Sequence, residues 1–139
     1  MNEDLQHLKI LSIFHYVVAG IAAIFACFPI FHLMMGISML SGGFDIPDDP
    51  SMPFPFRIFG LMFTLIPAVI ILFGWAFAIS MAVAGYFLGK QRNYMFCLVM
   101  AGIACVFTPF GTVLGIFTLI VLLRPSIKTL FNYSPPVQA

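Results

Sequence analysis

Two histidines, His15 and His32, interrupt long apolar stretches that contain no Asp, Glu, Lys or Arg. A histidine within lipid points first to a function such as haem ligation, quinone contact or proton handling. Two histidines that hold one haem must face each other at similar depth, yet these are 17 residues apart on one segment. That spacing is about 25 Å along a helix, so they cannot clamp one haem unless the chain folds sharply at Pro29. The competing interpretation of His15 is a neutral imidazole bonded to a backbone carbonyl, to Ser12 or to a neighbouring helix.

Other reactive side chains give little sign of catalysis. The three cysteines, Cys27, Cys97 and Cys105, lie in apolar stretches without CxxC or Cys/His spacing, so we expect neither zinc nor a disulfide framework. The sequence contains no GxSxG, HExxH or GxxxxGK[ST] motif. The lack of carboxylates in the apolar stretches also argues against proton-coupled transport by this chain alone. We therefore expect no enzyme and no cofactor, with His15 as the remaining candidate cofactor contact.

The elements that carry these residues are three apolar runs, residues 10–44, 58–89 and 93–123. About 20 apolar residues suffice to cross a bilayer core, and each run is longer. Hydrophobic residues make up 62% of the chain and charged residues 8%, far from soluble averages, and six Lys and Arg cannot form a nucleic-acid surface. The prediction is an all-α polytopic membrane bundle, with 1–139 forming a single integral membrane domain. Its expected segments are 9–40, 57–89, 94–108 and 112–124, with an external loop at 41–56.

Charge placement predicts the topology. Lys and Arg accumulate in cytoplasmic loops, whereas the loop at 41–56 is acidic and rich in proline. This pattern places both termini in the cytoplasm, with the chain crossing the membrane several times. Arg57 lies at the end of this acidic loop, and the other basic residues flank the apolar runs on the predicted cytoplasmic side: Lys9, Lys90, Arg92, Arg124 and Lys128.

The third run begins and ends beside basic residues, so it should enter the membrane and return. Pro109, Phe110 and Gly111 supply the expected turn, because proline removes a helix donor and glycine frees the backbone. The two arms would each measure about 20–22 Å, short of a bilayer core of about 30 Å. The hairpin therefore either spans a thin region or is re-entrant. The alternative is one kinked helix, which would place Arg124 outside.

Small residues at four-residue spacing mark helix faces that can approach closely. The longest such line lies in the second run, and shorter pairs lie in the first and third. We expect these residues at helix–helix interfaces, either within the chain or with another chain. The helix-packing candidates are Ala22, Ala26, Gly74, Ala78, Ala82, Gly111 and Gly115.

The first two runs are longer than a bilayer requires. A continuous helix over 10–40 would measure about 46 Å, so it must tilt or break, and Pro29 and Pro67 are positioned to bend the two runs. The apolar segments beyond these prolines would contact lipid headgroups or a partner subunit.

Three stretches carry a resemblance: HLKILSIFHY at 7–16, CVFTPFGTVLG at 105–115 and VLLRPS at 121–126. With them, about half of the chain resembles a group of small, uncharacterised bacterial inner-membrane proteins with several helices. The resemblance implies a bacterial membrane location and no established activity, so no functional residue carries over.

Three functions remain open at this stage. The favoured one is a non-enzymatic accessory or scaffold subunit that packs against another membrane protein complex. The others are a small channel or carrier formed by a homo-oligomer, and a redox subunit that contacts haem or quinone through His15. All three make the lipid bilayer a partner, and none involves nucleic acid.

Overall fold

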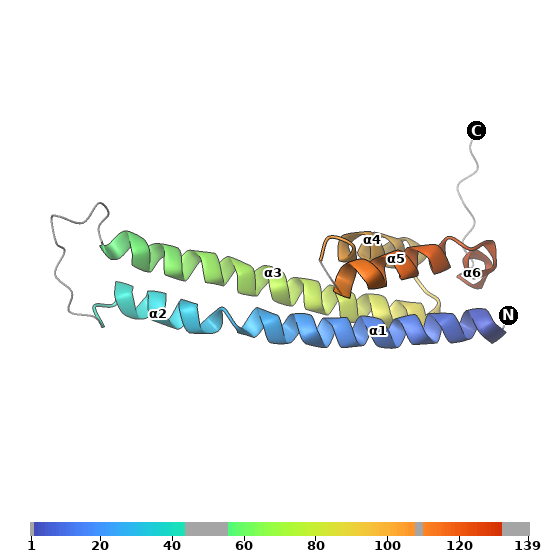
Figure 1. Ribbon diagram of the computed structural model, residues 1–139, viewed down its shortest axis with the longest axis horizontal. Coiled ribbons are helices and arrows are strands. Elements are labelled where there is room, and N and C mark those ends of the chain that lie inside the picture. The colour runs from blue at the N-terminus through green and yellow to red at the C-terminus, as the bar shows by residue number, and fades with distance from the viewer. Residues whose placement is uncertain (1, 44–55, 108–109, 132–139) are drawn as a thin grey trace, which may run out of the picture. The chain divides into compact units, whose positions relative to one another are not determined.

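The computed structural model describes residues 2–43, 56–107 and 110–131, and every regular element within them is a helix. The all-helical prediction is therefore confirmed for these ranges. The acidic part of the expected loop, from residue 44 to 55, and the expected turn residue Pro109 lie outside the described residues. In chain order the helices are α1 (Asn2–Cys27), α2 (Ile30–Leu40), α3 (Phe56–Lys90), α4 (Tyr94–Ala104), α5 (Phe110–Leu122) and α6 (Pro125–Leu130) (Figure 1).

The prolines of the two long segments have different outcomes. Pro29 lies between α1 and α2, where one helix ends at Cys27 and the next begins at Ile30. Pro67 instead lies inside α3, which runs for 35 residues, or about 52 Å. Without an N–H, Pro67 leaves the carbonyl of Phe63 without its usual helical donor.

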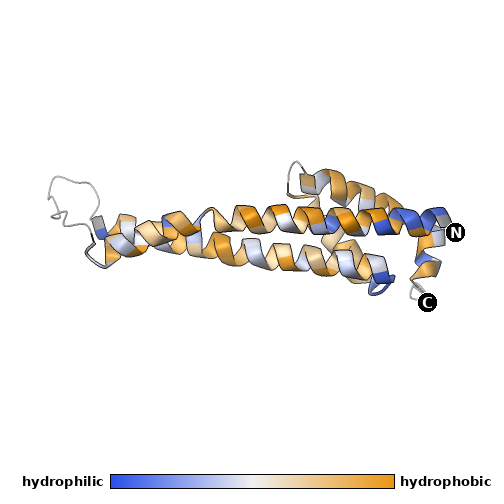
Figure 2. Ribbon diagram, turned by 90° about the horizontal axis from the view of Figure 1, so that it is seen from below, coloured by the Kyte–Doolittle hydropathy of each residue, from blue (hydrophilic) through white to orange (hydrophobic). Residues whose placement is uncertain are grey.

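Two stretches are long and apolar enough to cross a membrane, as judged by length and composition: Glu3–Leu40 and Arg57–Lys90. Only 11% of the most apolar window of each is buried within the protein. The core helix of a soluble protein would bury most of such a window, and an internal segment such as Arg57–Lys90 is not a signal sequence. In Figure 2, orange marks the hydrophobic residues that make up most of α1, α2 and α3.

The chain divides into two compact units. Unit 1 comprises residues 1–21 and 78–139, and unit 2 comprises residues 22–77.

In unit 1 the third apolar run folds back on itself. The Tyr94 hydroxyl, at the start of α4, donates a hydrogen bond to the Leu122 carbonyl, at the end of α5, over 3.0 Å. Arg124 lies 4.0 Å from Asp4 of α1, so the end of α5 lies beside the N-terminal end of α1. α4 and α5 are thus antiparallel neighbours, with lengths of about 16 and 20 Å from their 11 and 13 residues.

Unit 2 is a close antiparallel pair, α2 with the first part of α3 (Figure 1). A Cβ atom added to Gly36 would lie 2.5 Å from the carbonyl carbon of Phe63 and 2.6 Å from its oxygen. Gly36 therefore covers the same carbonyl that Pro67 leaves without a helical donor. Further along the pair, a Cβ at Gly74 would lie 2.8 Å from that of Ala26.

Candidate functional site

Four of the seven predicted packing residues lie at close helix–helix contacts. Gly111 and Gly115 of α5 lie against α4, and a Cβ atom at each would come within 2.6 and 2.5 Å of the Ala104 and Ala101 carbonyl oxygens, respectively. Ala26 is buried against Gly74 in unit 2, as described above. These contacts join helices of this chain, so the three glycines among them serve internal packing.

The remaining predicted residues differ in how deeply they are buried. Ala78 is buried, whereas Ala22 and Ala82 are half-buried. Phe110, predicted for the turn, begins α5 and is 67% exposed.

His15 is fully buried in unit 1, on the face of α1 that approaches α3. Its Nδ1 lies 2.9 Å from the Leu11 carbonyl oxygen. A carbonyl only accepts hydrogen bonds, so the proton belongs on Nδ1 and the lone pair on Nε2. The backbone bond considered from the sequence thus exists, and it satisfies one side of the ring.

The other ring nitrogen has no such partner. Among the described residues, none forms a hydrogen bond to the buried Nε2 of His15. Buried polar atoms are rarely left in this state, and an unpaired acceptor can take a hydrogen bond from a ligand or bind a metal. The part of the chain that the structure describes contains no cluster of three or more metal-ligating side chains. His32, the second histidine considered for haem, belongs to unit 2.

Ser12, one turn from His15, has a different role from the one considered in the sequence. Its hydroxyl donates to the Gly85 carbonyl over 2.6 Å, which ties α1 to α3. A Cβ at Gly85 would lie 3.0 Å from the Ser12 carbonyl oxygen and 3.1 Å from the His15 Cβ. The close helix approach therefore depends on glycine at this position.

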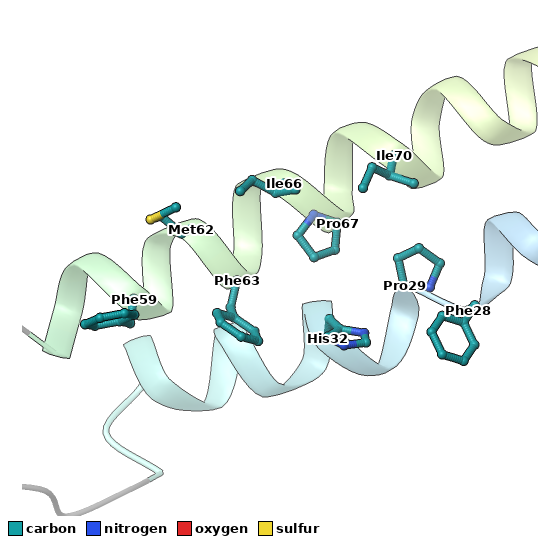
Figure 3. A pocket seen from close by; sticks show the side chains of 9 residues that line it. All are labelled: Phe28, Pro29, His32, Phe59, Met62, Phe63, Ile66, Pro67 and Ile70. Atoms are coloured by element: carbon teal, nitrogen blue, oxygen red, sulfur yellow. The ribbon is translucent and has the colours of Figure 1, made fainter. Parts of the chain in front are cut away.

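Unit 2 contains a hollow that sequence reasoning missed (Figure 3). It has a volume of about 440 Å³, within the range of small-molecule and side-chain pockets, and its surface is almost entirely carbon. His32 supplies the imidazole, and the two prolines of the long segments lie on the wall. The lining residues are Phe28, Pro29, His32, Phe59, Met62, Phe63, Ile66, Pro67 and Ile70.

His32 is held among aromatic rings. Its ring centroid lies 5.9 Å from that of Phe28, 6.0 Å from that of Phe31 and 6.2 Å from that of Phe63, with Phe63 stacked on it. Phe28 is one helical turn from His32, a spacing visible in the sequence, but Phe63 comes from a different helix. The arrangement offers an apolar guest one polar contact, the imidazole, inside an aromatic wall.

The comparisons with known proteins add no relative: no family model, no curated protein and no solved structure matches this chain.

Proposed function

We propose that this chain is a multi-pass protein of a bacterial inner membrane that acts as a non-enzymatic accessory or scaffold subunit for another membrane protein. In this proposal α1 with α2, and α3, cross the bilayer. α4 and α5 form a short returning hairpin that gives four membrane segments, and both termini lie in the cytoplasm.

The length of α3 is the observation that carries the proposal. At about 52 Å it exceeds a hydrocarbon core of about 30 Å by about 20 Å. An average tilt of about 20° removes only a small part of that surplus. The hairpin helices, at about 16 and 20 Å, are instead shorter than the hydrocarbon core. The thickness of one bilayer core cannot equal both the length of α3 and the length of the hairpin helices. A partner protein that covers the surplus apolar surface of α3 would resolve this difference in length.

The hollow of unit 2 is the proposed contact for that partner. Met62 and Ile66 on its rim are each 50% exposed, so a side chain from another helix can reach it. A bulky apolar side chain fits its carbon walls, and the His32 imidazole provides one directional contact. Partners that insert an apolar anchor into such a pocket derive much of their affinity from it.

Filling the hollow tests this proposal. The variant Ile66→Trp places an indole in the hollow, while Leu65→Trp, at the neighbouring and 56% exposed position outside the lining, is the matched control. We expect wild type and Leu65→Trp to be isolated from native membranes with one stoichiometric partner, and Ile66→Trp to lose it while still inserting. Equal recovery of the partner in all three forms, or a lone monomer in wild type, would contradict the proposal.

The unpaired Nε2 of His15 favours a second candidate, a subunit that contacts a lipophilic redox ligand such as quinone or haem. An apolar hollow of about 730 Å³ lies between α1 and α5, but His15 is not among the residues that line it, so this candidate rests on the unpaired Nε2 alone. Under this candidate, protein purified in mild detergent retains a quinone or a haem absorbance that His15→Leu abolishes. A preparation without either ligand would exclude it and leave the accessory function untouched.

A further inference from the structure

A third hollow lies at the charged end of unit 1, in the groove between α1 and α3. Its volume is about 420 Å³, and unlike the other hollows described above it has a substantial polar surface. Lys9 and Tyr16 line it from α1, and Lys90 and Tyr86 line it from α3. The same pair of residue types therefore faces the groove from both helices.

Within the part of the chain that the structure describes, neither lysine forms an ion pair with a carboxylate. Both are exposed, and the ion pair that forms at this end among the described residues joins Arg124 to Asp4 instead. Glu3, the nearby acidic residue of α1, is exposed and does not line the groove. Two ammonium groups from separate helices thus share one uncompensated site, which attracts an anion.

The tyrosines extend the groove along the helices. Tyr16 lies seven residues beyond Lys9, about 10 Å further along α1, and Tyr86 lies four residues, about 6 Å, from Lys90. Both rings are about half exposed, at 46% and 50%. Phenol rings with one apolar face and one hydroxyl are typical of the level at which lipid headgroups meet acyl chains.

Glycine allows α1 and α3 to approach closely at the floor of this groove. A Cβ at Gly89 would lie 3.2 Å from the Ser12 hydroxyl oxygen, so a side chain there would press on α1. The Ser12 hydroxyl itself is engaged with the Gly85 carbonyl, which fixes the two walls relative to each other. Packing within unit 1 therefore sets the positions of the two helices that form the groove.

We propose that this groove binds the phosphate of an anionic phospholipid, with the phosphate between Lys9 and Lys90 and the glycerol esters beside Tyr16 and Tyr86. Basic pockets between membrane helices on the cytoplasmic side bind such headgroups. The inference rests on the proposed membrane location. It adds the chemical class of a bound lipid and the residues that select it.

Native mass spectrometry of the full chain, released from nanodiscs of mixed phosphatidylglycerol and phosphatidylcholine, measures this selection. We expect wild type to retain phosphatidylglycerol preferentially. Lys9→Gln with Lys90→Gln should reduce the preference about 25-fold, at about fivefold for each ammonium group near the surface. Lys9→Arg with Lys90→Arg should retain it.

The matched control removes the same charge elsewhere. Arg92→Gln with Lys128→Gln leaves the groove lining intact, so it should change the preference little. Equal losses in the two glutamine pairs, or no preference in wild type, would overturn the inference. Inorganic phosphate added in excess should not displace the lipid, and displacement would show a free-phosphate site instead.

Vesicle flotation of the same preparations separates this inference from the proposed membrane location. A protein that does not float refutes the membrane location. A protein that floats without lipid preference refutes only the lipid site in the groove.

Discussion

The α4–α5 hairpin predicts that two glycines only 13 positions apart respond oppositely to the same substitution. A Cβ atom at Gly115 would lie 2.5 Å from the Ala101 carbonyl oxygen, 2.6 Å from the Cys105 sulfur and 2.9 Å from the Cys105 backbone nitrogen. At Gly102, on α4 of the same hairpin, a Cβ atom would meet nothing within 4 Å. Gly115→Ala and Gly102→Ala are therefore a matched pair.

The magnitude follows from these distances. The contact at Gly115 falls about 0.9 Å short of the 3.4 Å at which ordinary contact begins, and the opposing atoms include backbone that cannot rotate away. Overpacking of this kind costs about 1–3 kcal/mol. Both substitutions gain about 1 kcal/mol of helix propensity, so the difference between the variants isolates the packing cost. We expect Gly115→Ala to be less stable than Gly102→Ala by about 1–3 kcal/mol.

Reversible unfolding in mixed micelles, followed by circular dichroism, gives the two free energies of unfolding. Gly102→Ala should equal or slightly exceed wild type in stability. If Gly115→Ala matched Gly102→Ala, the two helices would not approach as closely as described, and the returning hairpin would be refuted along with the internal role of Gly115.

Two further single contacts can be tested by substitution. Gly36→Ala should lower the free energy of unfolding by about 1–2 kcal/mol, because its Cβ would lie 2.5 Å from the backbone of Phe63. Gly20→Ala is the control, since the space around Gly20 is open, and it should not lower the free energy of unfolding. Similar values for both variants in the same micelle assay would refute the close α2–α3 contact. Tyr94→Phe removes the hydrogen bond to the Leu122 carbonyl and should cost about 0.5–1.5 kcal/mol, and unchanged stability would show that the bond does not hold the hairpin ends together.

Much of the helical fold could be predicted from the sequence, because long apolar runs without charge have few alternatives. Whether the helix ends or continues at Pro29 and at Pro67 could not be predicted, because this depends on contacts between residues that are distant in the sequence. α3 continues through Pro67 where Gly36 of another helix packs against the freed Phe63 carbonyl. No local signal at residue 67 reveals a glycine 31 positions earlier.

The same reason explains which site residues were found. The sequence singled out His15 and offered a backbone carbonyl as one of three alternative partners, and the Leu11 carbonyl, one turn away, is the one that it contacts. It did not reveal the hollow around His32, because Phe63 joins that hollow from α3. Small-residue spacing did indicate Gly111 and Gly115, because close helix approach requires small residues.

Cysteine accessibility in intact bacterial cells tests the central claim, a membrane protein whose third run returns to the cytoplasm. In a variant without Cys27, Cys97 and Cys105, a single cysteine is placed at Ser126 or at Ser41, both exposed in the structure. An impermeant thiol reagent should label position 41 in intact cells and position 126 only after the cells are permeabilised. Labelling at position 126 in intact cells would contradict the account.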